Sequence, residues 1–320
     1  MHKRRLGRSD ITVAPWCFGG NVFGWTADRD TSFALLDAFV GAGFDFIDTA
    51  DMYSRWVPGH VGGESESVIG EWLAARGGRD RVVIATKVGM GQPNRTGALD
   101  RSHITTSIEA SLKRLRTDYV DLYQSHADDS DTPIEETLEA YAGLVKAGKV
   151  RIIGASNFSA ARLRQSLDVS AARGIPRYET LQPEYNLSNR SDFEGEVQDL
   201  CVAEEVGVIP FYALAAGFLT GKYRSDADYA KSPRGQSMAK RLDARGLRIL
   251  AALDAVSARH GMSLAAVALA WLMVQPSIVA PIASATSLDQ FRDLVTAADL
   301  VLGADDLSEL DTASRPSAEA

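Results

Sequence analysis

The sequence has little cysteine and little histidine. Two cysteines, Cys17 and Cys201, stand alone in apolar surroundings, and no C-x-x-C pair occurs among the 320 residues. A disulfide framework and a cysteine-rich zinc site are therefore excluded. The five histidines form neither H-x-H nor H-E-x-x-H. We therefore expect no metal centre of the kind found in barrel hydrolases.

The sequence also lacks an excess of positive charge. Lysine and arginine number 34 against 42 aspartates and glutamates, a net charge of −8. That balance argues against a nucleic-acid or anionic-membrane partner. The apolar run 263–274 is too short to cross a membrane, and no apolar segment follows the basic start as in a signal peptide. We expect a cytoplasmic protein, a monomer or homo-oligomer, that acts on a small molecule.

Short apolar runs alternate with helical patterns along the chain. Each run is four to eight residues long, as is typical of strands buried on both faces. Helical patterns cover 32–42, 102–115, 133–146 and 159–174, with Ser159 and the pair Thr132–Pro133 as start signals. The predicted strands are 15–19, 44–48, 81–87, 119–125, 150–156, 180–183, 207–212 and 278–282.

Eight strands that alternate with helices favour a closed (β/α)8 barrel. An open doubly wound sheet is disfavoured because no G-x-G-x-x-G follows the first strand. Residues 4–14 are predicted to form an N-terminal β-hairpin that plugs the barrel bottom. Residues 224–245 are predicted to be a long loop, with a helix over 246–260 behind it. We therefore predict an α/β protein with one TIM-barrel domain over 1–320, an N-terminal hairpin and extra helices.

Four polar residues follow three consecutive predicted strands. Asp48 ends the second apolar run, Tyr53 comes five residues later, Lys87 ends the third run, and His126 follows the fourth. Active-site groups of a barrel lie at the carboxyl ends of its strands. These four side chains are therefore expected to converge.

The four residue types suit proton transfer to oxygen. An ammonium beside a phenol favours the phenolate and lowers the pKa of the tyrosine, while an aspartate keeps the lysine charged. Such a tyrosine can donate a proton to a carbonyl oxygen, and a histidine can orient that oxygen. None of these groups is a redox centre, so a cofactor must supply the carbon chemistry, and hydride transfer fits. On spacing alone, a structural Asp–Lys pair with His126 as an ordinary rim residue stays an open alternative.

Eight stretches of the sequence are specific when taken together. They are GFDFIDTADMYS (43–54), GGESESVIGEWL (62–73), VVIATKVG (82–89), DYVDLYQSH (118–126), GKVRIIGASNFS (148–159), LQPEYNL (181–187), GFLTGKY (217–223) and TSLDQF (286–291). With these stretches the chain resembles an aldo-keto reductase from the hairpin to about residue 298. The resemblance implies a (β/α)8 barrel with a nicotinamide cofactor and no metal. It also implies that Tyr53 is the general acid/base, that Lys87 and Asp48 tune it, and that His126 orients the substrate.

The resemblance further implies a cofactor groove. Ser156, Asn157 and Gln182 match the residues that hydrogen-bond the nicotinamide carboxamide. Two side chains of this kind can fix which face of the ring points at the substrate. The remaining matches are Gly20 at the nicotinamide ribose, Lys222 and Arg234 at the pyrophosphate, and Ser284, Thr286, Gln290 and Asp293 at the adenosine-phosphate end.

The chain departs from the family pattern in three places. After the seventh predicted strand it has Phe211-Tyr212-Ala213-Leu214 where many members have Tyr-Ser-Pro-Leu. Either Phe211 or Tyr212 is expected to stack on the nicotinamide, with Leu214 in the same cofactor segment. The 2′-phosphate region offers Thr286 and Ser287 but no arginine or lysine at its usual start, and hydroxyls bind phosphate more weakly than a guanidinium. The resemblance still implies NADP(H), and this departure leaves NAD(H) as the alternative. Lastly, Leu294 replaces a common asparagine near the adenine.

Two tryptophans on rim loops, Trp25 and Trp56, are expected to form an apolar substrate wall, with Asn21 and Val22 as weaker candidates. Plain packing is the alternative for the tryptophans. The predicted function is an NADP(H)-dependent oxidoreductase that reversibly reduces aldehydes or ketones to alcohols. Two other functions stay open: an NAD(P)-dependent dehydrogenase of a sugar-like or polycyclic alcohol, and a cofactor-binding regulatory subunit with little turnover.

Overall fold

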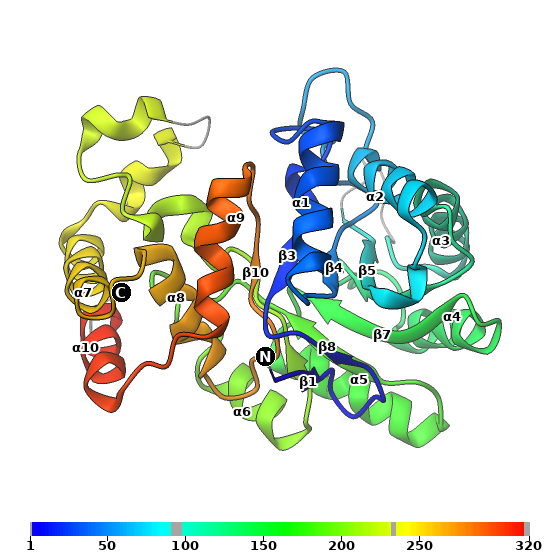
Figure 1. Ribbon diagram of the computed structural model, residues 1–320. Coiled ribbons are helices and arrows are strands. Elements are labelled where there is room, and N and C mark those ends of the chain that lie inside the picture. Colours follow the sequence, from blue (N-terminus) through cyan, green and yellow to red (C-terminus); the bar gives the residue numbers. More distant parts are fainter. Residues whose placement is uncertain (1, 91–97, 232–234, 317–320) are drawn as a thin grey trace.

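Eight parallel strands form the main sheet of the computed structural model, which describes residues 2–90, 98–231 and 235–316 (Figure 1). The strand order is β10-β3-β4-β5-β6-β7-β8-β9. The strands are β3 (Cys17–Gly19), β4 (Phe46–Asp48), β5 (Val83–Val88), β6 (Val120–Ser125), β7 (Val150–Ser156), β8 (Tyr178–Gln182), β9 (Gly207–Val208) and β10 (Ile282–Ala283). All eight overlap or adjoin the predicted runs.

The sheet closes on itself between β9 and the segment that leads into β10. The backbone amide of Val279 donates to Val208 O at 2.8 Å, and that of Ile282 donates to Pro210 O at 2.8 Å. On the other side of this segment, Cys17 N donates to Pro281 O at 3.0 Å. The predicted (β/α)8 barrel is therefore confirmed. The regular part of the eighth strand starts later than the predicted 278, because the earlier residues meet β9 at a single bridge.

An antiparallel hairpin of β1 (Arg4–Arg5) and β2 (Thr12–Val13) precedes the barrel. Its apolar residues Leu6, Ile11 and Val13 are buried in one cluster with interior strand residues such as Phe46 and Leu122. The hairpin therefore fills the lower end of the barrel, as predicted. The cluster removes these side chains from water and closes the barrel floor.

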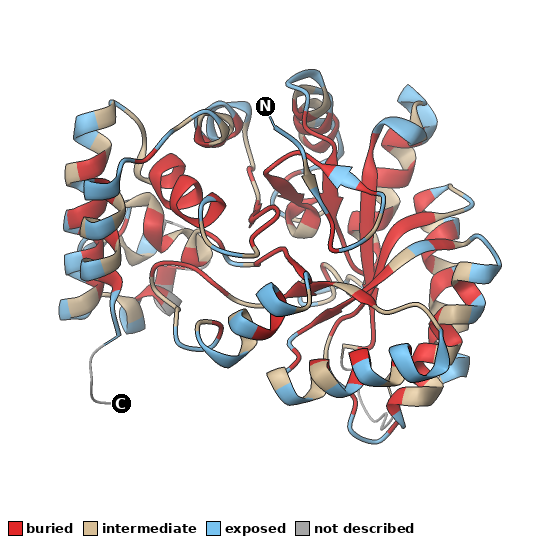
Figure 2. Cartoon of the chain, turned by 90° about the horizontal axis from the view of Figure 1, so that it is seen from below, coloured by how far each residue is buried: buried red, intermediate tan, exposed pale blue. Residues whose placement is uncertain are grey.

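Helices surround the sheet, and they are buried on the side that faces the strands (Figure 2). Among the described residues, no single helix is long and apolar enough to cross a membrane. Only α7 and α8 together reach that length and composition, and they meet at a bend of 95°. The helices are α1 (Arg29–Gly41), α2 (Glu64–Arg76), α3 (Arg101–Leu115), α4 (Ile134–Lys146), α5 (Ala160–Arg173), α6 (Glu196–Ala203), α7 (Ala244–His260), α8 (Leu264–Met273), α9 (Leu288–Val295) and α10 (Ala304–Ser314).

Two helix starts, those of α4 and α5, can be compared with the start signals predicted from the sequence. Ser159 caps α5, because its side chain accepts a hydrogen bond from Arg162 N. The Thr132–Pro133 signal was only partly right: α4 begins after Pro133, but Thr132 Oγ1 donates to Asp129 instead of capping the helix.

The segment predicted to be a long loop, 224–245, is partly helical among its described residues. It contains two short 3-10 helices, Asp226–Lys231 and Gly235–Arg241. The start of α7 also lies two residues before the predicted 246, because the side chain of Asp243 caps it by accepting from Gly246 N at 2.7 Å.

Strand periodicity positions the polar layer above this floor. Successive side chains on a strand point to opposite faces, so residues two positions apart share the barrel interior. Phe46, Ala85 and Leu122 belong to the apolar interior cluster. Two positions further along their strands are Asp48, Lys87 and Gln124, all buried.

Candidate active site

Asp48, Lys87 and Tyr53 form one hydrogen-bonded network at the carboxyl ends of β4 and β5. Lys87 Nζ donates to Asp48 Oδ2 at 2.7 Å, to Tyr53 Oη at 2.7 Å and to Thr49 O at 2.8 Å. Tyr53 Oη also donates to Asp48 Oδ2 at 3.0 Å. Lys87 is 0% exposed and Asp48 is 1% exposed. The phenol is therefore fixed between an ammonium and a carboxylate.

His126 completes the set from the end of β6. Its ring centroid lies 6.0 Å from that of Tyr53, at an interplanar angle of 73°. Its backbone amide donates to Val88 O at 2.8 Å, which ties it to the end of β5. Its Nδ1 is buried and accepts or donates no hydrogen bond within the described residues. The structure thus brings together the four residues that the strand ends indicated.

The pKa of Tyr53 shifts in the direction opposite to the one predicted. Burial and the adjacent Asp48 carboxylate raise the pKa of this phenol well above its ordinary value. The sequence argument counted only the ammonium, whose attraction for a phenolate is outweighed by desolvation and by the carboxylate. Tyr53 is therefore a neutral phenol at neutral pH.

Burial also shifts the pKa values of Lys87 and His126. Burial lowers the pKa of Lys87, although its contact with Asp48 opposes the shift. Burial and the charge of Lys87 lower the pKa of His126 well below its ordinary value. His126 is therefore a neutral imidazole at neutral pH, which can orient a polar oxygen without adding charge.

Three polar side chains line the opposite edge of this layer, at the ends of β7 and β8. Ser156 Oγ donates to Gln182 O at 2.8 Å, and Asn157 Nδ2 donates to His126 O at 3.0 Å. Asn157 has a φ of 58°, a left-handed conformation that asparagine tolerates better than most residues. Gln182 Nε2 donates to Asp48 Oδ1 at 3.0 Å, so this group is bonded to the tyrosine network.

These three residues fit a nicotinamide carboxamide. The side-chain amide nitrogens of Gln182 and Asn157 are engaged by protein oxygens. Within the described residues, the side-chain oxygens of Gln182 and Asn157 accept no hydrogen bond. Two acceptors at this edge match the two hydrogens of a carboxamide NH2 group.

The segment after β9 is unusually contorted. Tyr212, Ala215 and Ala216 have φ values of 52°, 48° and 55°, and Gly217 follows at 98°. Such left-handed positions cost about 1–3 kcal/mol each for residues other than glycine and cluster at functional sites. Lys222 lies against this turn, since a Cβ on Gly217 would be 3.3 Å from Lys222 Nζ. An ammonium at a turn of this kind suits a phosphate.

Both aromatic residues of this segment lie at the barrel rim. The Phe211 and Tyr212 ring centroids are 5.2 Å apart, at 64°. Phe211 is half-buried against the interior cluster, whereas Tyr212 is 46% exposed. Leu214 is half-buried against the outer core. Arg234, predicted at the pyrophosphate, lies outside the described residues.

At the predicted adenosine end, most residues bond to their own loop. Gln290 Oε1 accepts from Thr286 N at 2.9 Å and from Thr286 Oγ1 at 3.1 Å. Asp293 is exposed, and its carbonyl accepts from Thr296 Oγ1. Leu294 is buried in the outer core. The contacts of Gln290 hold the start of α9, and those of Asp293 and Leu294 lie at its end.

Two predicted residues lie at the seam between β3 and β10. Ser284 Oγ donates to Gly19 O at 2.6 Å and to Asn21 Oδ1 at 2.8 Å. Gly20 is buried, and a Cβ there would lie 2.8 Å from Asp48 O. The glycine is thus required by close packing on β4.

One of the two rim tryptophans, Trp56, packs against the tyrosine, and Trp25 packs against Trp56. Trp25 and Trp56 form an edge-to-face pair with centroids 5.5 Å apart, and Trp56 lies 6.1 Å from Tyr53. Trp56 is 45% exposed. Val22, in contrast, is buried in the outer core, and Asn21 is bonded to Ser284 at the seam. Of the four residues predicted to form a substrate wall, the tryptophans are thus the pair packed beside Tyr53.

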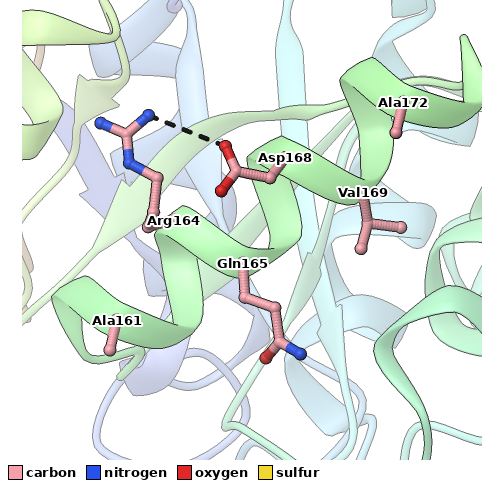
Figure 3. Close-up of a pocket in the computed structure, with 6 residues that line it drawn as sticks. All are labelled: Ala161, Arg164, Gln165, Asp168, Val169 and Ala172. Carbon is pink, nitrogen blue, oxygen red and sulfur yellow. Dashed lines mark ion pairs between the residues drawn. The ribbon is translucent and has the colours of Figure 1, made fainter.

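A surface hollow lies elsewhere, on the outer face of α5 (Figure 3). Arg164, Gln165, Asp168 and Val169 line it, and Arg164 Nη1 lies 3.9 Å from Asp168. It contains no convergent donors, so it does not suggest a site. Across the described ranges, no group of three or more His, Cys, Asp or Glu is arranged to hold a metal ion.

Sequence reasoning missed three residues that support the site. Gln124 contacts both Asp48 and Gln182. Gly154 on β7 makes room for it. Asn186 Nδ2 donates to Tyr212 O at 3.0 Å and supports the contorted segment. A polar residue two positions after Leu122, on the same face of β6 as Val120 and Leu122, was the available signal for Gln124.

Comparison with known proteins agrees with this fold. A sequence model of the aldo/keto reductase family matches residues 15–315. Protein tas of Escherichia coli is 32% identical over 97% of both chains. Norsolorinic acid reductase stcV of Emericella nidulans is 33% identical over 94% of this chain and 78% of its own. A probable voltage-gated potassium channel subunit beta of Oryza sativa is 33% identical over 94% of this chain and 92% of its own.

The barrel, the polar layer at its carboxyl end and this match define the class: the chain belongs to the aldo/keto reductase family. As a member it is an oxidoreductase by descent, and the family generally binds nicotinamide cofactors.

Proposed function

We propose that this protein is an NADP(H)-dependent oxidoreductase that interconverts carbonyl compounds and alcohols, with Tyr53 as general acid and base. The observation that carries the proposal is the position of Tyr53 Oη, 2.7 Å from Lys87 Nζ and beside His126. A phenol in this setting can protonate an oxygen that lies between it and the imidazole. Asp48 and Lys87 hold it there.

The protein's own residues carry out the proton transfer of the reaction. When bound, the nicotinamide supplies the hydride to the carbonyl carbon. The neutral His126 imidazole orients the carbonyl oxygen toward Tyr53. Tyr53 then donates its proton to the developing alkoxide, which is a stronger base than a phenolate. The Lys87 ammonium, 2.7 Å away, stabilises the phenolate that results, and in the oxidative direction this phenolate accepts the proton of the alcohol.

The cofactor would lie along the rim from β7 to α9. Ser156, Asn157 and Gln182 would hold the carboxamide, Phe211 or Tyr212 would stack on the ring, and Lys222 would bind the pyrophosphate. For the 2′-phosphate, Thr286 and Ser287 lie at the start of α9, where the helix dipole favours anions. Arg292 on the same helix is paired with Asp289 at 2.5 Å. Hydroxyls and the helix start therefore support NADP(H), with NAD(H) as the weaker ligand.

The substrate that we propose is an aromatic carbonyl compound. Trp25, Trp56 and Tyr53 present three rings around the reacting position, and aromatic pairs stabilise each other by about 0.5–1.5 kcal/mol beyond area burial. The similarity to a protein named for norsolorinic acid reduction supports the same class. Polycyclic alcohols would be the corresponding substrates in the oxidative direction.

The decisive variant is Tyr53→Phe. It removes one hydroxyl, so the fold and the binding of NADPH should be retained while turnover of 4-nitrobenzaldehyde falls about 10²- to 10⁴-fold. Turnover is followed by NADPH absorbance, and cofactor binding by quenching of intrinsic fluorescence. Unchanged turnover would defeat the assignment of the acid.

A second candidate is a cofactor-binding regulatory subunit with little turnover, favoured by the similarity to a plant protein named as a channel subunit. The two functions differ in rate and in assembly. A steady-state assay with an aldehyde panel, combined with the mass of the protein in solution, distinguishes them. Turnover below about 10⁻² per second together with a stable oligomer would favour the regulatory subunit.

A further inference from the structure

The two oxygens of the Asp48 carboxylate serve different partners. Oδ2 accepts from Lys87 Nζ and Tyr53 Oη, at 2.7 and 3.0 Å. Oδ1 accepts from Gln182 Nε2 at 3.0 Å and from Gln124 Nε2 at 3.5 Å. The carboxylate therefore joins the proton donor on one side to a pair of amides on the other.

Gln124 reaches this position across β7. It lies on β6, is fully buried, and accepts from Gln182 Nε2 at its Oε1, at 3.4 Å. The strand between them has a glycine at the facing position: Gly154 pairs with Gln124 on one side and with Thr180 on the other.

A side chain at Gly154 would obstruct that path. A Cβ there would lie 3.2 Å from Gln124 Cγ and 2.2 Å from Thr180 Oγ1. Glycine inside a strand is unfavourable unless another group approaches closely, and here the approaching groups are Thr180, Leu122 and Gln124, of which Thr180 is much the nearest. The glycine is thus required by Thr180, and it also leaves the Gln124 side chain unobstructed.

The orientation of both amides follows from the charge of Asp48. An ionised carboxylate only accepts hydrogen bonds, so each glutamine must turn its NH2 group toward it. Gln182 then uses one N–H on Asp48 and the other on Gln124 Oε1. Both of its hydrogens are engaged, and its Oε1 is left facing away from the network as an acceptor.

We propose that Gln124 is a positioning residue that fixes the Gln182 amide with its oxygen toward the crevice, and so determines which face of a bound nicotinamide meets the substrate. This inference rests on the proposed function, because it concerns the carboxamide that Gln182 would hold. If Gln124 is replaced, the second N–H of Gln182 is left unpaired. The Gln182 amide can then rotate and present a donor where the carboxamide NH2 needs an acceptor. The ring would then be held less tightly and in both orientations.

Gln124→Met tests this role, because methionine keeps the length of the side chain and lacks the amide. The dissociation constant for NADP⁺, from fluorescence quenching, should rise about 3- to 10-fold, the effect of one net hydrogen bond. NADPH that carries deuterium at one or the other C4 position reports the face used. The wild type should transfer from one position only, and the variant should transfer about 1–10% from the other.

Leu122→Met is the matched control. Leu122 lies on the same strand and face, two positions earlier, and is also fully buried. It should change neither the dissociation constant nor the face selection. Equal effects in the control, or unchanged binding and face selection in a folded Gln124→Met, would overturn the role of Gln124.

Gln124→Asn provides a second route if the methionine variant does not fold. It retains an amide that is one methylene too short to reach Gln182, and it should show the same change in face selection. A wild type that does not bind NADP⁺ would instead refute the proposed function, and this role with it.

Discussion

Removal of the Lys87 ammonium, alone and together with the Asp48 charge, should affect the free energy of unfolding and the turnover differently. The pair with Asp48 is almost fully shielded from water, with side-chain exposures of 0% and 1%. Removing one member of a buried ion pair costs about 3–5 kcal/mol, since the partner is left as an uncompensated charge. In Lys87→Met, Asp48 keeps the donors Tyr53 Oη and Gln182 Nε2, so we expect the lower end, about 3 kcal/mol.

The second half of this prediction concerns the double variant Lys87→Met/Asp48→Asn. With both charges gone, the desolvation penalty disappears, and the free energy of unfolding should return to within about 1 kcal/mol of the wild type. Turnover should not return, because the phenol still lacks the ammonium that stabilises its conjugate base. The two properties should therefore diverge between the single and double variants.

Urea unfolding followed by circular dichroism measures the free energy, and an unchanged m-value shows that the comparison is valid. Aldehyde reduction with NADPH measures turnover on the same samples. Additive effects of the two substitutions, within about 0.5 kcal/mol, would refute the reasoning. So would a single variant as stable as the wild type.

Two further predictions concern Asp306 on α10 and Trp56 beside Tyr53. His260 and Arg259 lower the pKa of Asp306 to about 2, so the contribution of this carboxylate to stability is complete above about pH 4 and is lost as the pH falls through 2. Asp306→Asn should therefore lower the free energy of unfolding by about 1 kcal/mol at pH 6 and leave it unchanged near pH 2, as measured by chemical unfolding. A difference in free energy of unfolding that is the same at both pH values would contradict this. Trp56→Ala should raise KM for aromatic aldehydes about 2- to 10-fold and leave KM for propanal nearly unchanged, because a ring-to-ring contact with the exposed indole stabilises by about 0.5–1.5 kcal/mol beyond area burial and a three-carbon chain lacks it. An unchanged KM for aromatic aldehydes would show that Trp56 does not contact the substrate ring.

The sequence predicted the barrel and the convergence of its polar residues because both depend on local patterns. Buried parallel strands read as apolar runs, and period-two alternation places Asp48 and Lys87 on the inner face. The predicted β7 matches its observed range, Val150–Ser156. The shortest strands were predicted too long: β9 has two residues where six were expected, because only Gly207 and Val208 pair regularly with β8.

The predictions that failed concern properties that depend on contacts across the barrel. The direction of the Tyr53 pKa shift results from burial and from Asp48, and neither can be weighed from spacing. Val22 looked like part of a substrate wall by its place on a rim loop, but its side chain is buried in the outer core. Gln124 was overlooked because its partner, Gln182, lies 58 residues away in the sequence.

The seam between β3 and β10 also determines when the barrel can close during translation. Ser284 and Gly19, which bond across it, are 265 residues apart, so a growing chain on the ribosome cannot join them until nearly all of it has been translated. Until then β3 has a free edge, and free edges readily pair with other polypeptides and aggregate. A chaperone that shields this edge during translation would therefore raise the yield of native protein more than one that acts after release.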